Sequence, residues 1–147
     1  MTKLPPIEKI YEAWTALADH RVDIKFENPE EGYADVSSSD GQKAYVVKFS
    51  GNKYSSDDNA TYWRGYAGYP VIAVMMLQGK LPFDEEEAAK WSGINWTRLN
   101  KEHRNNYGAV VAEVCAQRGI DATRASEAAQ RVMDVLATLP AEIKRKI

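Results

Sequence analysis

The pattern of hydrophobic and polar positions is helical at residues 6–18, strand-like from there to residue 50 and helical again in most of the remainder. Residues 6–18 carry apolar side chains spaced three and four apart, which predicts a helix with one buried face. Period-two alternation follows in three segments and is typical of strands with one wet face. These strands are predicted at residues 21–27, 33–38 and 42–50. Because turn residues separate the strands, we expect an antiparallel meander.

Residues 70–78 are apolar on almost every side, which predicts a buried central helix that begins at Pro70 and ends at Gly79. Asp84 and Asp121 stand where helix N-caps are expected. Helices are predicted at residues 84–93, 95–118 and from 121 onward, before a short basic end piece that starts at Pro140. The predicted fold class is α+β, in a single domain over residues 1–147. Residues 1–79 supply the N-terminal helix, three-stranded antiparallel meander and buried central helix, and residues 80–147 supply a C-terminal helical cap.

Composition and charge narrow the classes of protein to consider. With 147 residues, 44% of them hydrophobic, the chain can bury a core without disulfides. The single cysteine, Cys115, and the lack of an apolar leader after Met1 indicate a cytoplasmic protein, and no apolar run approaches the ~20 residues of a membrane span. The net charge of −2 leaves room only for a local basic patch. The tail Lys144, Arg145 and Lys146 is one candidate, although a solvated helix end is the simpler interpretation.

Metal and cofactor chemistry find little support in the residues. Cys115, His20 and His103 are too few for a closed zinc site. His103 lies four residues from both Leu99 and Tyr107 and is predicted to be a partly buried, hydrogen-bonded histidine. Cys115 is predicted to be an inert core thiol. No phosphate-binding glycine pattern occurs, so no cofactor is expected and the sequence favours a non-enzymatic role.

The acidic pair Asp57 and Asp58 leaves two interpretations open. With Asn59, these side chains could form a cation-binding site or the site of a small hydrolase-like enzyme that also uses His103. In the other interpretation, the same residues make turns and cap a short helical segment.

Aromatic side chains crowd the stretch that surrounds this acidic pair. They either form an exposed stacking platform with Arg64 or wedge the loop between sheet and helix. The first alternative predicts a non-enzymatic interaction domain that binds a protein or nucleic-acid partner. Its candidate contact residues are Tyr54, Asp57, Asp58, Tyr62, Trp63, Arg64, Tyr66 and Tyr69.

The segment VSSSDGQKAYVVKFSGNKYSSDDNATYWRGYAGYPVIAVMM resembles the SWIM-type zinc finger, in which a strand pair leads to Cys-x-Cys and a helix opens with Cys-x-His. Tyr54 and Ser56 fall at the first two ligand positions, and Gly68 and Pro70 at the second two. The resemblance covers residues 34–77. It implies a metal-free relative in which aromatic packing and the fixed φ of Pro70 replace the zinc crosslink. It also implies binding of nucleic acid or protein rather than catalysis.

Overall fold

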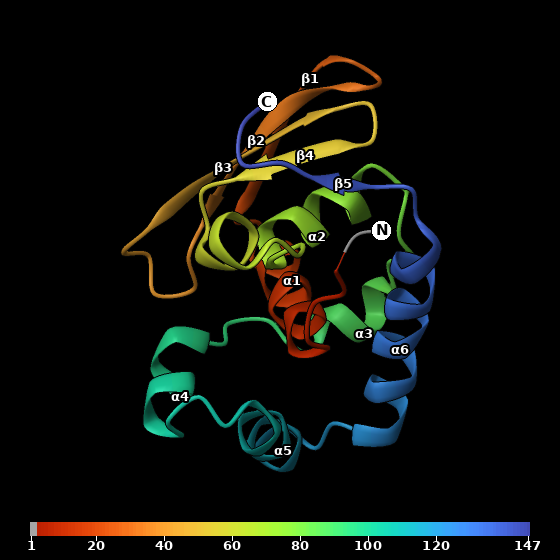
Figure 1. Ribbon diagram of the computed structural model, residues 1–147. Helices are drawn as coiled ribbons and strands as arrows, with labels where there is room; N and C mark the ends of the chain where they lie inside the picture. The colour runs from red at the N-terminus through yellow and green to blue at the C-terminus, as the bar shows by residue number, and fades with distance from the viewer. Residues whose placement is uncertain (1–2) are drawn as a thin grey trace.

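A five-stranded sheet with all of the helices on one side forms the α+β fold of the chain, as the computed structural model shows for residues 3–147 (Figure 1). The predicted fold class is confirmed. The helices are α1 (Glu8–Ala18), α2 (Tyr69–Leu77), α3 (Glu85–Ala89), α4 (Trp96–Glu102), α5 (Tyr107–Arg118) and α6 (Ala122–Thr138), with one π-helical turn, η1 (Ala60–Arg64). The strands are β1 (Val22–Asn28), β2 (Glu31–Ser37), β3 (Ala44–Ser50), β4 (Lys53–Ser56) and β5 (Glu142–Ile143).

The sheet has the strand order β1-β2-β3-β4-β5. Strands β1 to β4 are antiparallel neighbours, and β5 pairs with β4 in parallel. The alternation read from the sequence gives the sheet its two faces. On β2, for example, Ala34 and Val36 are buried, whereas Tyr33 and Asp35 are exposed. The outer face is therefore the polar one, and no helix covers it.

The sheet is larger than the predicted meander by two short strands. The predicted meander ends at residue 50, but Gly51 and Asn52 form a turn that leads into β4. Strand β5 arises because Lys53 and Tyr54 pair with Glu142 and Ile143. The end piece after Pro140 thus returns to the sheet.

Helix α2 lies directly against the inner face of the sheet, and α1 packs against α2 on the side away from the strands (Figure 1). As predicted, α2 is the central helix: Val71 through Met76 are buried, Pro70 occupies its first turn and Gly79 adopts a φ of 77° after its end. The buried residues form one hydrophobic cluster that reaches from the sheet to α6.

The C-terminal helices confirm both predicted N-caps. The Asp84 carboxylate accepts a hydrogen bond from the Glu87 amide, and Asp121 accepts two from the first turn of α6. The single helix predicted over residues 95–118 is wrong, because it is divided into α4 and α5. Arg104 and Asn105 adopt left-handed φ angles of 53° and 63°, which end α4.

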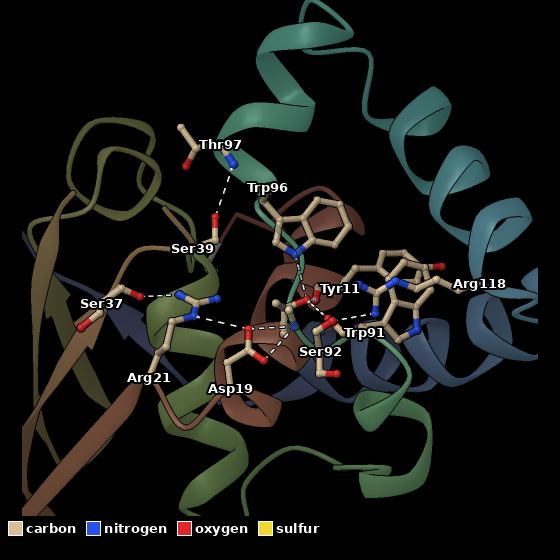
Figure 2. A network of polar contacts seen from close by, with 12 residues as sticks. Tyr11, Asp19, Arg21, Ser37, Ser39, Trp91, Ser92, Trp96, Thr97 and Arg118 are labelled. Carbon is tan, nitrogen blue, oxygen red and sulfur yellow. Dashed lines mark hydrogen bonds and ion pairs between the residues drawn. The ribbon is translucent and has the colours of Figure 1, made fainter. Parts of the chain in front are cut away.

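A network of hydrogen bonds holds the segment between α3 and α4 against α1 (Figure 2). The buried Thr15 hydroxyl donates to the Trp91 carbonyl at 2.7 Å and accepts from the Trp96 indole nitrogen at 2.8 Å. The Asp19 carboxylate accepts from the Gly93 amide at 2.8 Å. These bonds fix the position of the segment that connects α3 to α4 relative to α1.

Candidate functional site: an aromatic–basic pocket

The acidic pair supports the fold of the loop after β4. Asp57 accepts a hydrogen bond from the backbone amide of Val46 at 2.8 Å. The Asp58 carboxylate is buried and accepts from the Ser56 hydroxyl at 2.5 Å and from the Thr61 amide at 3.1 Å. Asp58 therefore binds the first turn of η1, in keeping with the second of the two interpretations, whereas Asn59, the N-cap residue, makes no side-chain capping bond.

Gly68 completes this buried polar cluster from the other end of the loop. Its amide donates to the Thr61 hydroxyl at 2.9 Å. A Cβ atom at Gly68 would lie only 2.1 Å from Oδ2 of Asp58 and 3.0 Å from the Thr61 hydroxyl oxygen. Glycine is thus required by the close approach of Asp58, and the two halves of the loop are joined through the Thr61 hydroxyl.

The aromatic residues of the loop divide between core and surface. Tyr54 and Tyr66 are buried, and the Tyr54 hydroxyl donates to the Gln78 side chain at 2.6 Å. Tyr69 is half-buried, and burial raises the pKa of its hydroxyl although Arg21 opposes the shift. These rings wedge the loop between sheet and helix. Trp63, with 67% of its surface exposed, is the most open of them.

The surface part of the loop is joined by the C-terminal tail. The guanidinium of Arg145 lies 5.4 Å from the ring centroid of Tyr62 and 5.5 Å from that of Trp63. The two rings meet edge to face with centroids 4.8 Å apart. Arginine over an aromatic ring is a favourable cation–π arrangement. Tyr62 and Trp63 are therefore joined at the surface by a residue of the tail.

A cavity of about 300 Å³ opens beside these side chains, between the outer face of the sheet and the tail. We call it the aromatic–basic pocket. Its lining residues are Val46, Lys48, Ser55, Ser56, Asp57, Tyr62, Arg145, Lys146 and Ile147. Three basic side chains and one acidic side chain line the pocket, so its side chains carry a local positive charge on a chain whose net charge is −2.

The structure separates the predicted contact residues into two sets. Asp57, Tyr62, Trp63 and Arg64 are exposed or half-exposed, and Asp57 and Tyr62 line the pocket. The buried or half-buried set is Tyr54, Asp58, Tyr66 and Tyr69. Lys48, Arg145 and Lys146 were missed as members of this site, although the basic tail was considered as a separate contact. They reach the site only through the pairing of β3 with β4 and of β4 with β5.

His103 and Cys115 lie away from this pocket. His103 Nε2 and Glu113 Oε2 are 2.9 Å apart, so the prediction of a partly buried, hydrogen-bonded histidine is confirmed. Cys115 is buried, and burial raises the pKa of its thiol, as expected for an inert core cysteine. Among residues 3–147, no three side chains of Asp, Glu, His or Cys are grouped so that they could hold a metal ion.

A small polar cavity of about 70 Å³ lies between α1, α4 and the sheet. Its buried acid, Glu12, accepts from the Asn100 amide at 3.3 Å and lies 3.1 Å from Lys9 Nζ. Burial opposes the charge on Lys9, but the Glu12 carboxylate outweighs this effect and the pKa of Lys9 is raised. This carboxylate is already paired, so the cavity is a weaker candidate than the aromatic–basic pocket.

Comparison with known families shows where the chain belongs. The model of the family described as uncharacterised conserved protein UCP014422 matches residues 2–142. The chain is a member of this family. The matched range of UCP014422 contains Lys48, Tyr62 and Trp63 and ends before Arg145. No curated protein and no solved structure matches the chain. Across residues 3–147, no helix has both the length and the apolar character that crossing a membrane requires.

Proposed function

We propose that this chain is a non-enzymatic binding domain that holds an anionic partner in the aromatic–basic pocket. The observation that carries the proposal is the position of Arg145 over both Tyr62 and Trp63, at a pocket that Lys48 and Lys146 also line. Trp63 does not line the pocket, but its exposed ring lies against Arg145 and Tyr62, which do. An exposed ring beside a pocket with several cations suits a ligand that has both planar groups and negative charge.

Single-stranded nucleic acid is the partner that fits this chemistry best. Proteins that bind single strands combine a positive groove for the phosphates with aromatic rings on which bases stack. Trp63 keeps 67% of its surface exposed although Arg145 lies against it, so the ring can still receive a base. The resemblance of residues 34–77 to the SWIM-type finger supports the same class of partner.

The roles of the acids favour binding over catalysis. Asp57 and Asp58 hold backbone amides and the Ser56 hydroxyl, as the cap of a turn does. A general base needs a carboxylate that is free to accept a proton from a substrate.

The proposal has two further parts. One is a cytoplasmic location, in keeping with the buried free thiol of Cys115, and the other is a metal-free loop of SWIM type. In that loop the Asp58 hydrogen bonds hold Ser56 near Gly68, where the zinc crosslink would be.

Fluorescence anisotropy with a labelled twelve-nucleotide oligo(dT) tests the binding function. Stacking on an aromatic ring contributes roughly 1–3 kcal/mol per base, so Trp63→Ala should raise the Kd by about 5-fold to 150-fold. Arg145→Ala should also weaken binding and reduce its salt dependence. If the pocket neutralises about three phosphates, the affinity of the wild type should fall roughly 20-fold between 50 and 200 mM salt.

Two matched variants control for losses that are unrelated to the pocket. Phe83→Ala removes an exposed ring outside the pocket, and Arg98→Ala removes an exposed guanidinium on α4. Both should bind like the wild type. The proposal is wrong if the oligonucleotide does not bind, or if the pocket variants and the controls lose affinity equally. An acidic peptide that binds where the oligonucleotide fails would reassign the partner to protein.

A further inference from the structure

The free edge of β1 has the geometry and the charge pattern to pair with a second copy of the same strand. Strand β1 is the outermost strand of the sheet, and β2 is its only partner among the strands of residues 3–147. An exposed strand edge offers unpaired amide and carbonyl groups to another chain. Its possible partners are constrained by which groups point outward and by which side chains flank them.

The hydrogen bonds of the sheet show which residues present the free groups. The Ser37 amide donates to the Arg21 carbonyl at 3.0 Å, so residue 21 and every second residue after it direct their backbone groups toward β2. The residues between them alternate in the opposite direction. Val22, Ile24 and Phe26 therefore present their N–H and C=O groups to the free edge.

Charge excludes the adjacent registers of a symmetric pair and allows the one centred on Ile24, which pairs Val22 through Phe26 without reaching the irregularity beyond Phe26. On the outer face, β1 carries Asp23 and Lys25, both exposed. When two antiparallel copies are centred on Ile24, each Asp23 lies opposite the partner's Lys25, and the outward-facing groups of the two strands match in hydrogen-bonded pairs. Moving the centre by one residue, to Asp23 or to Lys25, would place identical charges opposite each other. Like charges opposite each other are destabilising, so the adjacent registers are disfavoured.

The inner face of the edge adds an apolar contact in the same register. Phe26 is 50% exposed, although its ring contacts Phe49 at a centroid distance of 5.6 Å. Centring the pair on Ile24 places Phe26 opposite the partner's Val22, which is half-buried. The contact would remove exposed surface from one of the larger exposed hydrophobic side chains of the chain.

We propose that two copies of this chain associate through β1, antiparallel and centred on Ile24, to form one continuous sheet. Natural edge strands commonly carry charges that repel other strands. Here the charges have both signs in a self-complementary order, and the irregularity of β1 lies beyond Phe26, at the end of the strand. This proposal does not depend on the aromatic–basic pocket, because none of the pocket's lining residues belongs to β1.

Sedimentation velocity over a range of protein concentrations tests the interface. The wild type should reach twice the 16.5 kDa mass of the chain. Asp23→Lys and Lys25→Asp each place like charges opposite each other, and each should weaken the dimer at least about tenfold. The double variant, Asp23→Lys with Lys25→Asp, restores opposite charges and should dimerise like the wild type. Asp35→Lys, on the same face but one strand inward, is the matched control and should leave the dimer intact.

Cysteines at the same positions provide a second measurement. Opposite residues in a non-hydrogen-bonded antiparallel pair have Cα atoms about 4.5 Å apart, which suits a disulfide. The variant Asp23→Cys/Lys25→Cys should form a covalent dimer with oxidised glutathione, whereas Asp35→Cys should not. The proposal is overturned if the wild type stays monomeric at millimolar concentration, if both single charge reversals leave a dimer unchanged, or if the double charge variant fails to restore it. Circular dichroism of every variant distinguishes loss of the dimer from loss of the fold.

Discussion

Replacing Gly68 by alanine tests the buried polar cluster around Asp58, which shapes the loop between β4 and α2. Gly68 has φ −72° and ψ 172°, a conformation that alanine adopts without strain. The effect of the substitution therefore comes from the new methyl group, which would lie 2.1 Å from Oδ2 of Asp58. Asp58 is 5% exposed and must move if the methyl group is to fit.

The magnitude follows from the bonds that Asp58 makes. Moving its carboxylate breaks the hydrogen bonds from the Ser56 hydroxyl and the Thr61 amide. Hydrogen bonds to charged groups contribute about 1.5–3 kcal/mol each. Alanine offsets part of this loss, roughly 0.4–1 kcal/mol, by reducing the entropy of the unfolded chain. We expect Gly68→Ala to lower the free energy of unfolding by about 2–5 kcal/mol.

Urea denaturation followed by circular dichroism measures this change, and Gly108→Ala is the control. Gly108 lies in the first turn of α5 and is exposed, and a Cβ atom there would lie 3.8 Å from the Asn106 side-chain oxygen, which is an ordinary contact. The same substitution should therefore stabilise the protein there, by roughly 0.4–1 kcal/mol. If Gly68→Ala were as stable as the wild type, Asp58 could not be held as described.

Three further substitutions test the core and its caps. Thr15→Val leaves the Trp91 carbonyl and the Trp96 indole without their buried partner, and thermal unfolding should show a loss of about 2–4 kcal/mol that Thr15→Ser largely avoids. Burial raises the pKa of Tyr11 to about 12, so the folded protein favours the neutral form of this side chain. The contribution of Tyr11 to the free energy of unfolding is therefore complete below pH 10 and declines by about 2–3 kcal/mol as the pH rises to 12. Tyr11→Phe should flatten this alkaline decline in chemical denaturation, and an unchanged slope would contradict the assignment. Asn106→Ala should cost about 1 kcal/mol as the N-cap of α5 is lost, and equal melting temperatures would show that the cap is dispensable.

Signals from neighbouring residues predicted the elements whose limits such residues set. Helix α2 is apolar on all sides and is bounded by Pro70 and Gly79, so its burial and its limits could both be inferred. The break between α4 and α5 had a weaker signal. Asn105 tolerates the left-handed conformation, and Asn106, which follows it, caps α5. These two polar residues interrupt an otherwise continuous apolar stripe.

The site could be predicted only in part, because its two halves are distant in sequence. The loop identified Tyr62 and Trp63 as candidates, and the basic tail was considered as a separate contact. Strand β5 brings Arg145 to these rings, and a pairing of two residues with a strand so far away leaves no pattern that local periodicity can reveal. The burial of Asp58 likewise depends on its approach to Gly68 across the loop.

Tryptophan fluorescence during titration with oligo(dT) tests the proposed binding function most directly. Trp14, Trp91 and Trp96 are buried, whereas Trp63 is 67% exposed, so Trp63 is the tryptophan that a ligand can reach. A base stacked on its ring should quench the emission in a saturable manner, and Trp63→Phe should abolish the quenching while retaining most of the affinity. Emission that stays constant while anisotropy shows binding would place the partner elsewhere and contradict the account of the aromatic–basic pocket.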